Sequence, residues 1–241
     1  MTFGRVTILA AAIAVTLPGA AMAQSPHNWS GYYVGAVAGY GWSQSTSGPT
    51  RMYENFDGTD EDVINSPIPP FSFSGSGLIG GAEAGYNWQT GGLVMGVVGD
   101  IAAANIRGTY MDDSALFSVD STINWLSTAR FNIGVPMGNV LFYGTGGLAV
   151  GGVTNGLHDY YGDDVVNTSD KTTNVGWTAG GGVAAAITNN WIIKAEFLYV
   201  DLGTKNVSFS EPDAPDPGFG LITSSAKTTA SILRVGIDYK F

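Results

Sequence analysis

The carboxy-terminal segment, residues 231–241, constrains the fold more than any other stretch, because its side chains alternate between two chemically different faces. Every second residue from position 233 onward is apolar, whereas Arg234, Asp238 and Lys240 occupy intervening positions. A period of two residues is typical of a β-strand, in which successive side chains point to opposite faces. One apolar and one charged face suit either a soluble sheet or a transmembrane barrel strand whose charged face lines the lumen.

The same alternation recurs along the chain and predicts eight strands. They are expected at residues 30–42, 73–89, 93–104, 122–135, 140–154, 174–187, 191–202 and 231–241. Short turns alternate with long, irregular, acidic connections, which are residues 43–72, 105–121, 155–173 and 203–227. Because an antiparallel chain reverses direction at each connection, the long loops are expected at one end and the short turns at the other. Each predicted strand has at least 11 residues, and about 9–11 are needed to cross a bilayer at a tilt.

These patterns together predict an all-β fold, an eight-stranded antiparallel up-and-down transmembrane β-barrel with four long extracellular loops and three short periplasmic turns. A closed barrel also pairs every backbone group inside lipid, because it has no open sheet edge. Aromatic residues near the strand ends are expected to form girdles at the two membrane interfaces. They are Trp29, Tyr32, Tyr40, Trp42, Tyr86, Trp88, Trp125, Trp177, Trp191, Tyr199 and Tyr239.

Eight charged residues fall in the strand phase opposite to the apolar one, and they are expected to form a charge network in the lumen. They are Glu83, Asp100, Arg130, Lys194, Glu196, Arg234, Asp238 and Lys240, four acids and four bases. The long connections carry the acidic excess behind the net charge of −10. A soluble barrel would instead expose its charges outside and fill its interior with apolar side chains. The acidity also argues against nucleic acid as a partner, since phosphates require a basic surface.

Residues 1–23 are expected to be a secretory signal peptide, which leaves residues 24–241 as one outer-membrane β-barrel domain. Arg5 supplies the positive start, residues 6–17 form an apolar run, and Ala21 and Ala23 mark a small-residue cleavage site. No later segment is apolar over the ~20 residues of a membrane helix. The chain has no cysteine, which excludes a disulfide framework and a cysteine metal site.

Few residues are suited to catalysis or metal binding. The histidines are His27, near the expected cleavage site, and His158, in a long loop. A serine paired with His158 at the extracellular rim is conceivable, but no motif marks one, so we expect no enzyme and no cofactor. Asp57, Asp60 and Asp62 could supply oxygen ligands to a divalent cation. Their spacing matches no defined calcium loop, so solvated loop charge is the favoured interpretation and no other metal site is expected.

The apolar face of the last segment ends in Ile237, Tyr239 and Phe241, which we expect to serve as the assembly signal for the barrel-assembly machinery. Outer-membrane lipid and lipopolysaccharide are expected around the barrel. The acidic loops are candidates for contact with host surface components. The expected location is the outer membrane of a Gram-negative cell, with the loops exposed at the surface.

Five stretches of the sequence also resemble a known family, the small outer-membrane immunogenic proteins of alphaproteobacteria. These stretches are residues 29–42, 125–130, 143–149, 191–199 and 234–241. The resemblance implies an OmpA-like eight-stranded barrel of the kind often grouped with porins, with antigenic surface loops. It also implies a role in envelope integrity and host contact, and it implies no catalytic residues.

The preferred functional hypothesis is a structural outer-membrane barrel with acidic surface loops for antigenic, host or surface interaction. Eight strands enclose an interior just wide enough to be filled by side chains, so a general diffusion porin is rejected. One alternative is a narrow ion-conducting channel, which differs in whether the lumen charges pair closely. A weaker alternative is a soluble periplasmic carrier similar to a lipocalin.

Overall fold

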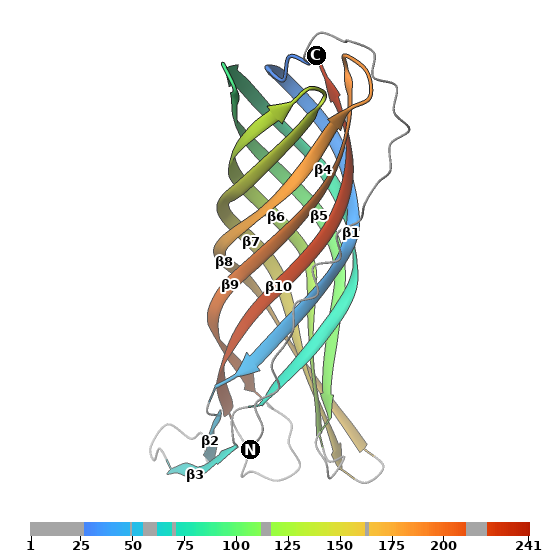
Figure 1. Cartoon of the computed structure of the whole chain (residues 1–241). Coiled ribbons are helices and arrows are strands. Elements are labelled where there is room, and N and C mark those ends of the chain that lie inside the picture. The colour runs from blue at the N-terminus through green and yellow to red at the C-terminus, as the bar shows by residue number, and fades with distance from the viewer. Residues whose placement is uncertain are drawn as a thin grey trace, which may run out of the picture.

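The computed structural model describes residues 27–48, 50–54, 62–68, 71–111, 117–161, 164–210 and 221–241. Within these ranges the chain forms ten β-strands (Figure 1). They are β1 (Gly31–Ser47), β2 (Thr50–Glu54), β3 (Asp62–Ile68), β4 (Ser72–Thr90), β5 (Leu93–Met111), β6 (Phe117–Met137), β7 (Val140–Tyr161), β8 (Asp164–Ala186), β9 (Trp191–Ser210) and β10 (Leu221–Lys240). No helix in the described ranges is long and apolar enough to cross a membrane.

Eight of these strands, β1 and β4 to β10, form a closed antiparallel ring. β1 pairs with β10 from Tyr33 opposite Lys240 to Ser47 opposite Ala226, so the first and last strands of the ring close it. The other two strands, β2 and β3, form a hairpin that continues the sheet from the start of β10, outside the ring. The structure thus confirms the predicted all-β, eight-stranded antiparallel barrel.

The two ends of the barrel differ in how the strands are connected. Tight turns join β4 to β5, β6 to β7 and β8 to β9 at one end, which also holds the carboxy terminus and is called the turn end here (Figure 1). Gly91 and Gly138 have φ angles of 60° and 62° in two of these turns, a left-handed conformation that suits glycine. The opposite end, where β5 meets β6, β7 meets β8 and β9 meets β10, is called the hairpin end.

The strands are longer than the sequence predicted, and this corrects the predicted loops. The β5–β6 ladder continues to Met111 opposite Ser118, and the β7–β8 ladder continues to Tyr161 opposite Asp164. Most of residues 105–121 and 155–173 is therefore strand, and part of 43–72 forms β2 and β3. The physical reason is that apolar alternation marks only the part of a strand that faces lipid. Backbone pairing continues beyond it, because hydrogen bonding between strands needs no apolar face.

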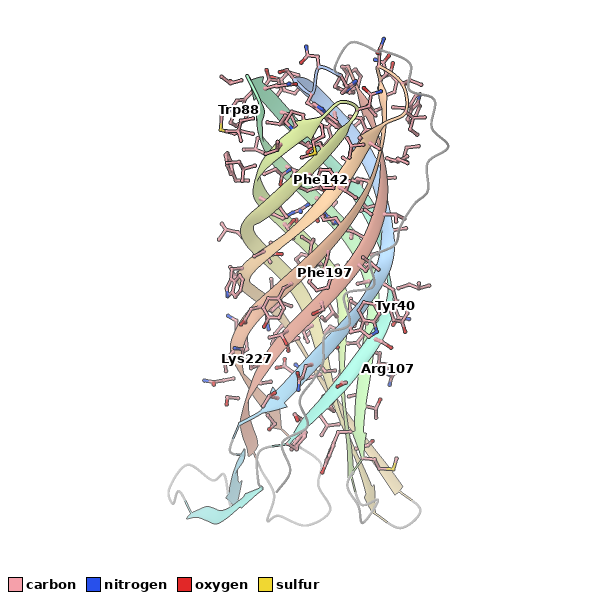
Figure 2. All side chains as sticks on the ribbon, in the orientation of Figure 1. Tyr40, Trp88, Arg107, Phe142, Phe197 and Lys227 are labelled. Carbon is pink, nitrogen blue, oxygen red and sulfur yellow. The ribbon has the colours of Figure 1, made fainter. Side chains whose placement is uncertain are left out.

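The outer surface of the barrel is apolar along its length between the two ends (Figure 2). On β10, Leu233, Val235 and Ile237 are exposed, as the alternation predicted. Phe142 and Phe197 likewise point outward from β7 and β9. Large exposed apolar side chains in such number are typical of a surface that contacts lipid, because soluble monomers rarely expose large contiguous apolar patches.

Ile123 shares the phase of Phe131 in the predicted strand 122–135 and was therefore expected to face outward, but it lies inside the barrel. Ile123 is only 3% exposed, whereas Phe131 on the same strand faces out. The pairing of β6 with β7 shifts between Ile123 and Trp125, which indicates a β-bulge. A bulge adds one residue to one strand, so the inward and outward phases exchange beyond it.

The interior consists of three layers stacked along the barrel. An apolar cluster fills the turn end and comprises Trp29, Val94, Leu141, Ala184 and Ile192. A larger apolar cluster lies toward the hairpin end and comprises Ile79, Ala102, Ile106, Ile123, Leu126, Ala149, Val153, Leu198, Val200, Leu202, Ala230 and Ile232. Most of the buried charged residues, among them Glu83, Asp100, Arg130, Glu196 and Arg234, occupy the level between them. The interior therefore contains apolar packing as well as charges. The sequence interpretation had expected apolar side chains in the interior only for a soluble barrel.

Candidate functional site

The middle layer of the lumen is a cluster of buried charged side chains from five different strands. We call it the lumen charge network, and it consists of Glu83 on β4, Asp100 on β5, Arg130 on β6, Lys194 and Glu196 on β9, and Arg234 and Asp238 on β10. All seven positions fall in the inward phase of their strands. The closed ring therefore brings together residues that are far apart in the sequence.

Two arginines and two carboxylates form the centre of this network. Arg130 donates hydrogen bonds from Nη2 to Asp100 Oδ2 at 2.9 Å and from Nη1 to Glu196 Oε1 at 2.8 Å. Arg234 donates from Nε to Glu196 Oε2 at 2.7 Å and from Nη2 to Asp100 Oδ2 at 3.3 Å. Each guanidinium thus bridges both carboxylates, and the four charges cancel. Such forked contacts use the fixed geometry of arginine, which a lysine could not reproduce.

Neutral side chains complete the central group. The Thr128 hydroxyl donates to Asp100 Oδ2 at 2.6 Å and accepts from Arg130 Nε at 2.8 Å. The Tyr143 hydroxyl donates to Glu196 Oε1 at 3.1 Å. These bonds satisfy polar atoms that would otherwise be costly to bury without partners.

Lys194 holds the remaining two carboxylates of the network. Its ammonium contacts Glu83 Oε1 closely and lies 3.5 Å from Asp238 Oδ2. The ring of Tyr33 faces the same ammonium, with its centroid 5.9 Å from Nζ. Arg234 Nη2 lies 3.8 Å from Glu83 Oε2, which joins this group to the central one.

Lys240, which was expected in the network, lies elsewhere. Its side chain points inward at the turn end, but the ammonium donates to the backbone carbonyl of Asn28. No ion pair joins it to the carboxylates of the network, all of which are among the described residues. The reason is positional, because Lys240 is the last residue of β10 and reaches the segment that precedes β1.

Trp29 also lies in a place that the sequence interpretation missed. It was expected in an interfacial girdle, but it is 1% exposed and forms the core of the turn-end cluster. Its backbone amide donates to Gln89 Oε1 at 3.0 Å, and the Gln89 amide donates to Ser30 Oγ at 2.9 Å. The strand alternation could have predicted the inward position of Trp29. Tyr33 and Val37 point inward, and Trp29 precedes them at an odd-numbered position of the same series.

His27 packs against Trp29 at the turn end of the barrel. The two rings are 4.9 Å apart in an edge-to-face arrangement. Burial, and then the nearby positive charge of Lys240, lowers the pKa of His27 below its ordinary value. The segment before β1 therefore carries a neutral histidine into the mouth of the barrel at neutral pH.

Other aromatic residues form contacts on the outer surface at two levels. Near the turn end, Tyr32 contacts Tyr86 at 4.6 Å, and Tyr239 contacts Trp191 at 5.1 Å between ring centroids. Toward the hairpin end, Tyr40 contacts Trp42 at 5.2 Å, and Trp177 contacts Tyr199 at 5.5 Å. These two groups bound the apolar surface, as girdles at membrane interfaces do.

The remaining candidate residues divide into two sets. Ile237, Tyr239 and Phe241 all point outward near the turn end, where the Tyr239 and Phe241 rings are 5.4 Å apart. The residues that the structure describes do not include Asp57 and Asp60. For Asp62 and His158 they include the backbone but not the side chain. Their expected roles therefore stay predictions.

The chain is similar to known proteins over nearly its whole length. The family model described as the outer membrane protein beta-barrel domain matches residues 7–241. A 31 kDa outer-membrane immunogenic protein of Brucella melitensis is 31% identical over 246 residues, covering 97% of this chain and 93% of that protein. A 22 kDa outer membrane protein of Rhizobium leguminosarum is 37% identical over 131 residues, covering 54% of this chain and 55% of that protein.

A solved outer-membrane barrel shows a distant likeness to the chain. The outer membrane protease OmpT of Escherichia coli superposes with a TM-score of 0.49 at 8% identity, covering 91% of this chain and 99% of that one. A likeness of this size carries no argument about activity.

Proposed function

The chain belongs to the outer membrane protein β-barrel family, and from this premise we propose that it is a structural outer-membrane protein with a closed lumen. Membership confirms the resemblance to alphaproteobacterial outer-membrane immunogenic proteins and the location in the Gram-negative outer membrane. In this proposal the barrel supports the envelope, and its long hairpins, with the acidic residues they carry, are available for contact at the cell surface.

The filling of the lumen is the observation that carries the proposal. An ion that crossed the barrel would have to pass the Trp29 cluster, the lumen charge network and the Leu198 cluster in turn. Apolar layers exclude hydrated ions, because an ion that loses its water there finds no compensating ligand. The close pairing of Arg130 and Arg234 with Asp100 and Glu196 blocks the middle layer. This filling argues against the narrow-channel alternative.

Planar-bilayer recording tests the closed lumen. The refolded protein, with folding verified by circular dichroism, is expected to insert without steady conductance. Trp29→Ala should stay closed as well, because the other two layers remain. A reproducible unitary current from the wild-type protein would contradict the proposal and favour the channel.

The soluble-carrier alternative does not fit the molecule. Its outer surface would have to be polar, but the outward phase of every ring strand carries apolar residues such as Leu78, Ile101 and Leu148. Family membership and outer-membrane location also contradict a soluble periplasmic protein.

We further propose that the hairpin end faces the cell exterior and the turn end faces the periplasm. Short turns on the periplasmic side and longer connections outside are typical of bacterial outer-membrane barrels. Single cysteines at Ser47, Ser114, Thr168 or Ser208 should react with a membrane-impermeant thiol reagent on intact cells. Cysteines at Thr90 and Asn189 serve as controls at the turn end and should be protected. Labelling of the turn positions alone would show the opposite orientation, with the turn end at the cell exterior.

The outward face of the last strand supports its proposed role as an assembly signal. Ile237, Tyr239 and Phe241 present a continuous apolar and aromatic row at the turn end, which a partner can reach from outside the barrel. Deletion of Phe241 should lower the outer-membrane level sharply while export continues. An unchanged level in fractionated membranes would contradict this role.

A further inference from the structure

The lumen charge network does not balance. Its acids are Glu83, Asp100, Glu196 and Asp238, and its bases are Arg130, Lys194 and Arg234. Four negative and three positive charges leave one negative charge in excess. Lys240, the fourth base expected from the sequence, is bound to the Asn28 carbonyl instead. An uncompensated charge in a dry interior is costly, so something must supply the missing positive charge.

The excess is located at Asp238. Asp100 and Glu196 are each held by two arginines. Lys194 holds Glu83 Oε1 closely, and Glu83 Oε2, which has no hydrogen-bond partner, lies 3.8 Å from Arg234 Nη2. Asp238 has only the longer contact of 3.5 Å between its Oδ2 and Lys194. Its other oxygen, Oδ1, has no hydrogen-bond partner although the residue is only 4% exposed.

Asp238 borders a space that could hold a ligand. A small cavity of about 40 Å³ lies between the turn-end cluster and the network, and Asp238 lines it. Its wall also contains oxygen-bearing side chains, those of Tyr33, Asn87, Asn132 and Tyr143. By size it has room for about two water molecules. On β1, Gly35 lies opposite Asp238, and a side chain there would overlap Oδ1.

We infer that the cavity beside Asp238 is a binding site for one monovalent positive charge, either a proton added to the carboxylate or an alkali cation held by it. One positive charge restores the balance of the network, whereas a divalent ion would overshoot it. Carboxylate, amide and hydroxyl oxygens are the donors that hard cations take. The ammonium of Lys194 on the cavity wall disfavours a second positive charge beyond this one.

Charged and titratable groups surround Asp238 from several strands. They are Tyr33 on β1, Glu83 on β4, Asp100 on β5, Arg130 on β6, Tyr143 on β7, Lys194 and Glu196 on β9, and Arg234 and Lys240 on β10. Most of them are already matched in opposite pairs. Of the network carboxylates only Asp238 lines the cavity, and its Oδ1 has no hydrogen-bond partner, which makes it the site for the added charge.

Infrared spectroscopy and unfolding of the refolded full-length barrel test this inference. A bound proton gives the carbonyl band of a neutral carboxylic acid, which should disappear in Asp238→Asn. A bound cation makes the unfolding midpoint fall when sodium and potassium chloride are replaced by N-methyl-D-glucamine chloride at equal ionic strength. Asp100→Asn is the matched control, because it makes the same chemical change in a carboxylate that both arginines already hold.

The variants also separate the site from an ordinary ion pair. Asp238→Asn should keep the wild-type unfolding midpoint or raise it, because the amide replaces the carboxylate and its added charge together. Asp100→Asn should lower the midpoint, because two arginines lose a partner. The inference is overturned if the wild type shows neither the acid band nor the alkali dependence, or if both variants lower the midpoint equally. The wild-type measurements decide by themselves if Asp238→Asn fails to fold.

Discussion

The two ladders formed by β8 differ along its length, and the difference divides the molecule into two regions. With β7 it stays paired from Val140 opposite Ala185 to Tyr161 opposite Asp164. With β9 it is paired only from Ala186 opposite Ile192 to Trp177 opposite Asp201. Beyond that level the β7–β8 and β9–β10 hairpins separate toward the lower end of Figure 1. The barrel is therefore a sealed cylinder near the turn end, and beyond that level it is open between β8 and β9, while β6 and β7 stay paired to Phe117 opposite Asp159.

A local feature of β9 accounts for the separation. Gly203 has a φ angle of 72°, a left-handed conformation that interrupts an extended strand. Its amide donates to Asp201 Oδ1 at 2.8 Å, and Asp201 also pairs with Lys227 at 3.1 Å. These contacts hold a bend in β9 at the level where its pairing with β8 ends.

The level of the separation also locates the membrane boundary. An unpaired strand edge is not tolerated in hydrocarbon, where no water can satisfy its backbone groups. The ladder ends at the Trp177 and Tyr199 contact, which belongs to the aromatic group toward the hairpin end. We therefore expect the sealed cylinder to be the part in lipid and the longer strand ends to extend beyond it.

The largest expected difference between the two regions concerns buried charge. Arg130→Ala should lower the free energy of unfolding by about 3–5 kcal/mol, because Asp100 and Glu196 lose a partner inside the sealed region. Lys205→Ala, an exposed change on the hairpin part of β9, should stay within about 0.5 kcal/mol. Urea unfolding in liposomes measures both.

A second substitution sharpens this test of the network. Adding Glu196→Gln to Arg130→Ala should recover part of the loss, because it removes a carboxylate that the first change left unpaired. Equal stability of Arg130→Ala and Lys205→Ala would mean that the lumen charges are hydrated rather than paired.

A somewhat smaller effect is expected from the apolar layer. Leu198→Ala should destabilise the barrel by about 2–5 kcal/mol, because Leu198 is 1% exposed and its removal leaves a cavity. Leu233→Ala is the matched control on the outer face, where lipid can fill the space, and it should cost less. If the two variants unfold alike, the interior layer is not packed as the structure shows.

Amide exchange should reveal the boundary on β8 itself. Amides that face β9 within residues 177–186 are hydrogen-bonded in the ladder and should exchange slowly. Amides on the same edge within residues 164–176 lack that ladder and should exchange much faster, while those facing β7 stay protected. Uniform protection along the whole β9-facing edge would show that the cylinder stays sealed to its end.

The smallest effect concerns the segment before β1. The folded protein lowers the pKa of His27, so neutral His27 contributes stability at pH values above its ordinary pKa of 6.5. That contribution is lost as pH falls below 6.5 and through the lower pKa of the folded state. The protection factor of the Trp29 amide, which compares its exchange with that of an unprotected amide at the same pH, should therefore fall between neutral and mildly acidic pH. His27→Gln should remove this pH dependence, and an unchanged dependence in that variant would assign it to another group.

The sequence by itself determined the ring of eight strands, the outward face and the inward phase of the charged residues. These features depend on a period of two residues, which is a local property of each strand. The face of Leu233 or Arg234 can be read without knowing its neighbours, because lipid on one side and a lumen on the other impose the same alternation on every strand. Trp29 follows the same phase, so its inward position was also within reach of the sequence.

Tertiary structure alone decided what the inward residues contact and where the barrel ends. The β-bulge beside Ile123, the bend at Gly203 and the length of the β7–β8 ladder depend on pairing between strands, which leaves little trace in the alternation of one strand. The contacts within the lumen charge network also depend on the tertiary structure. Eight charges appear balanced in the sequence, but closure of the ring brings Lys240 to the Asn28 carbonyl and leaves Asp238 with an unpartnered oxygen. Charge balance in a dry interior is set by distance, and only the folded barrel fixes those distances.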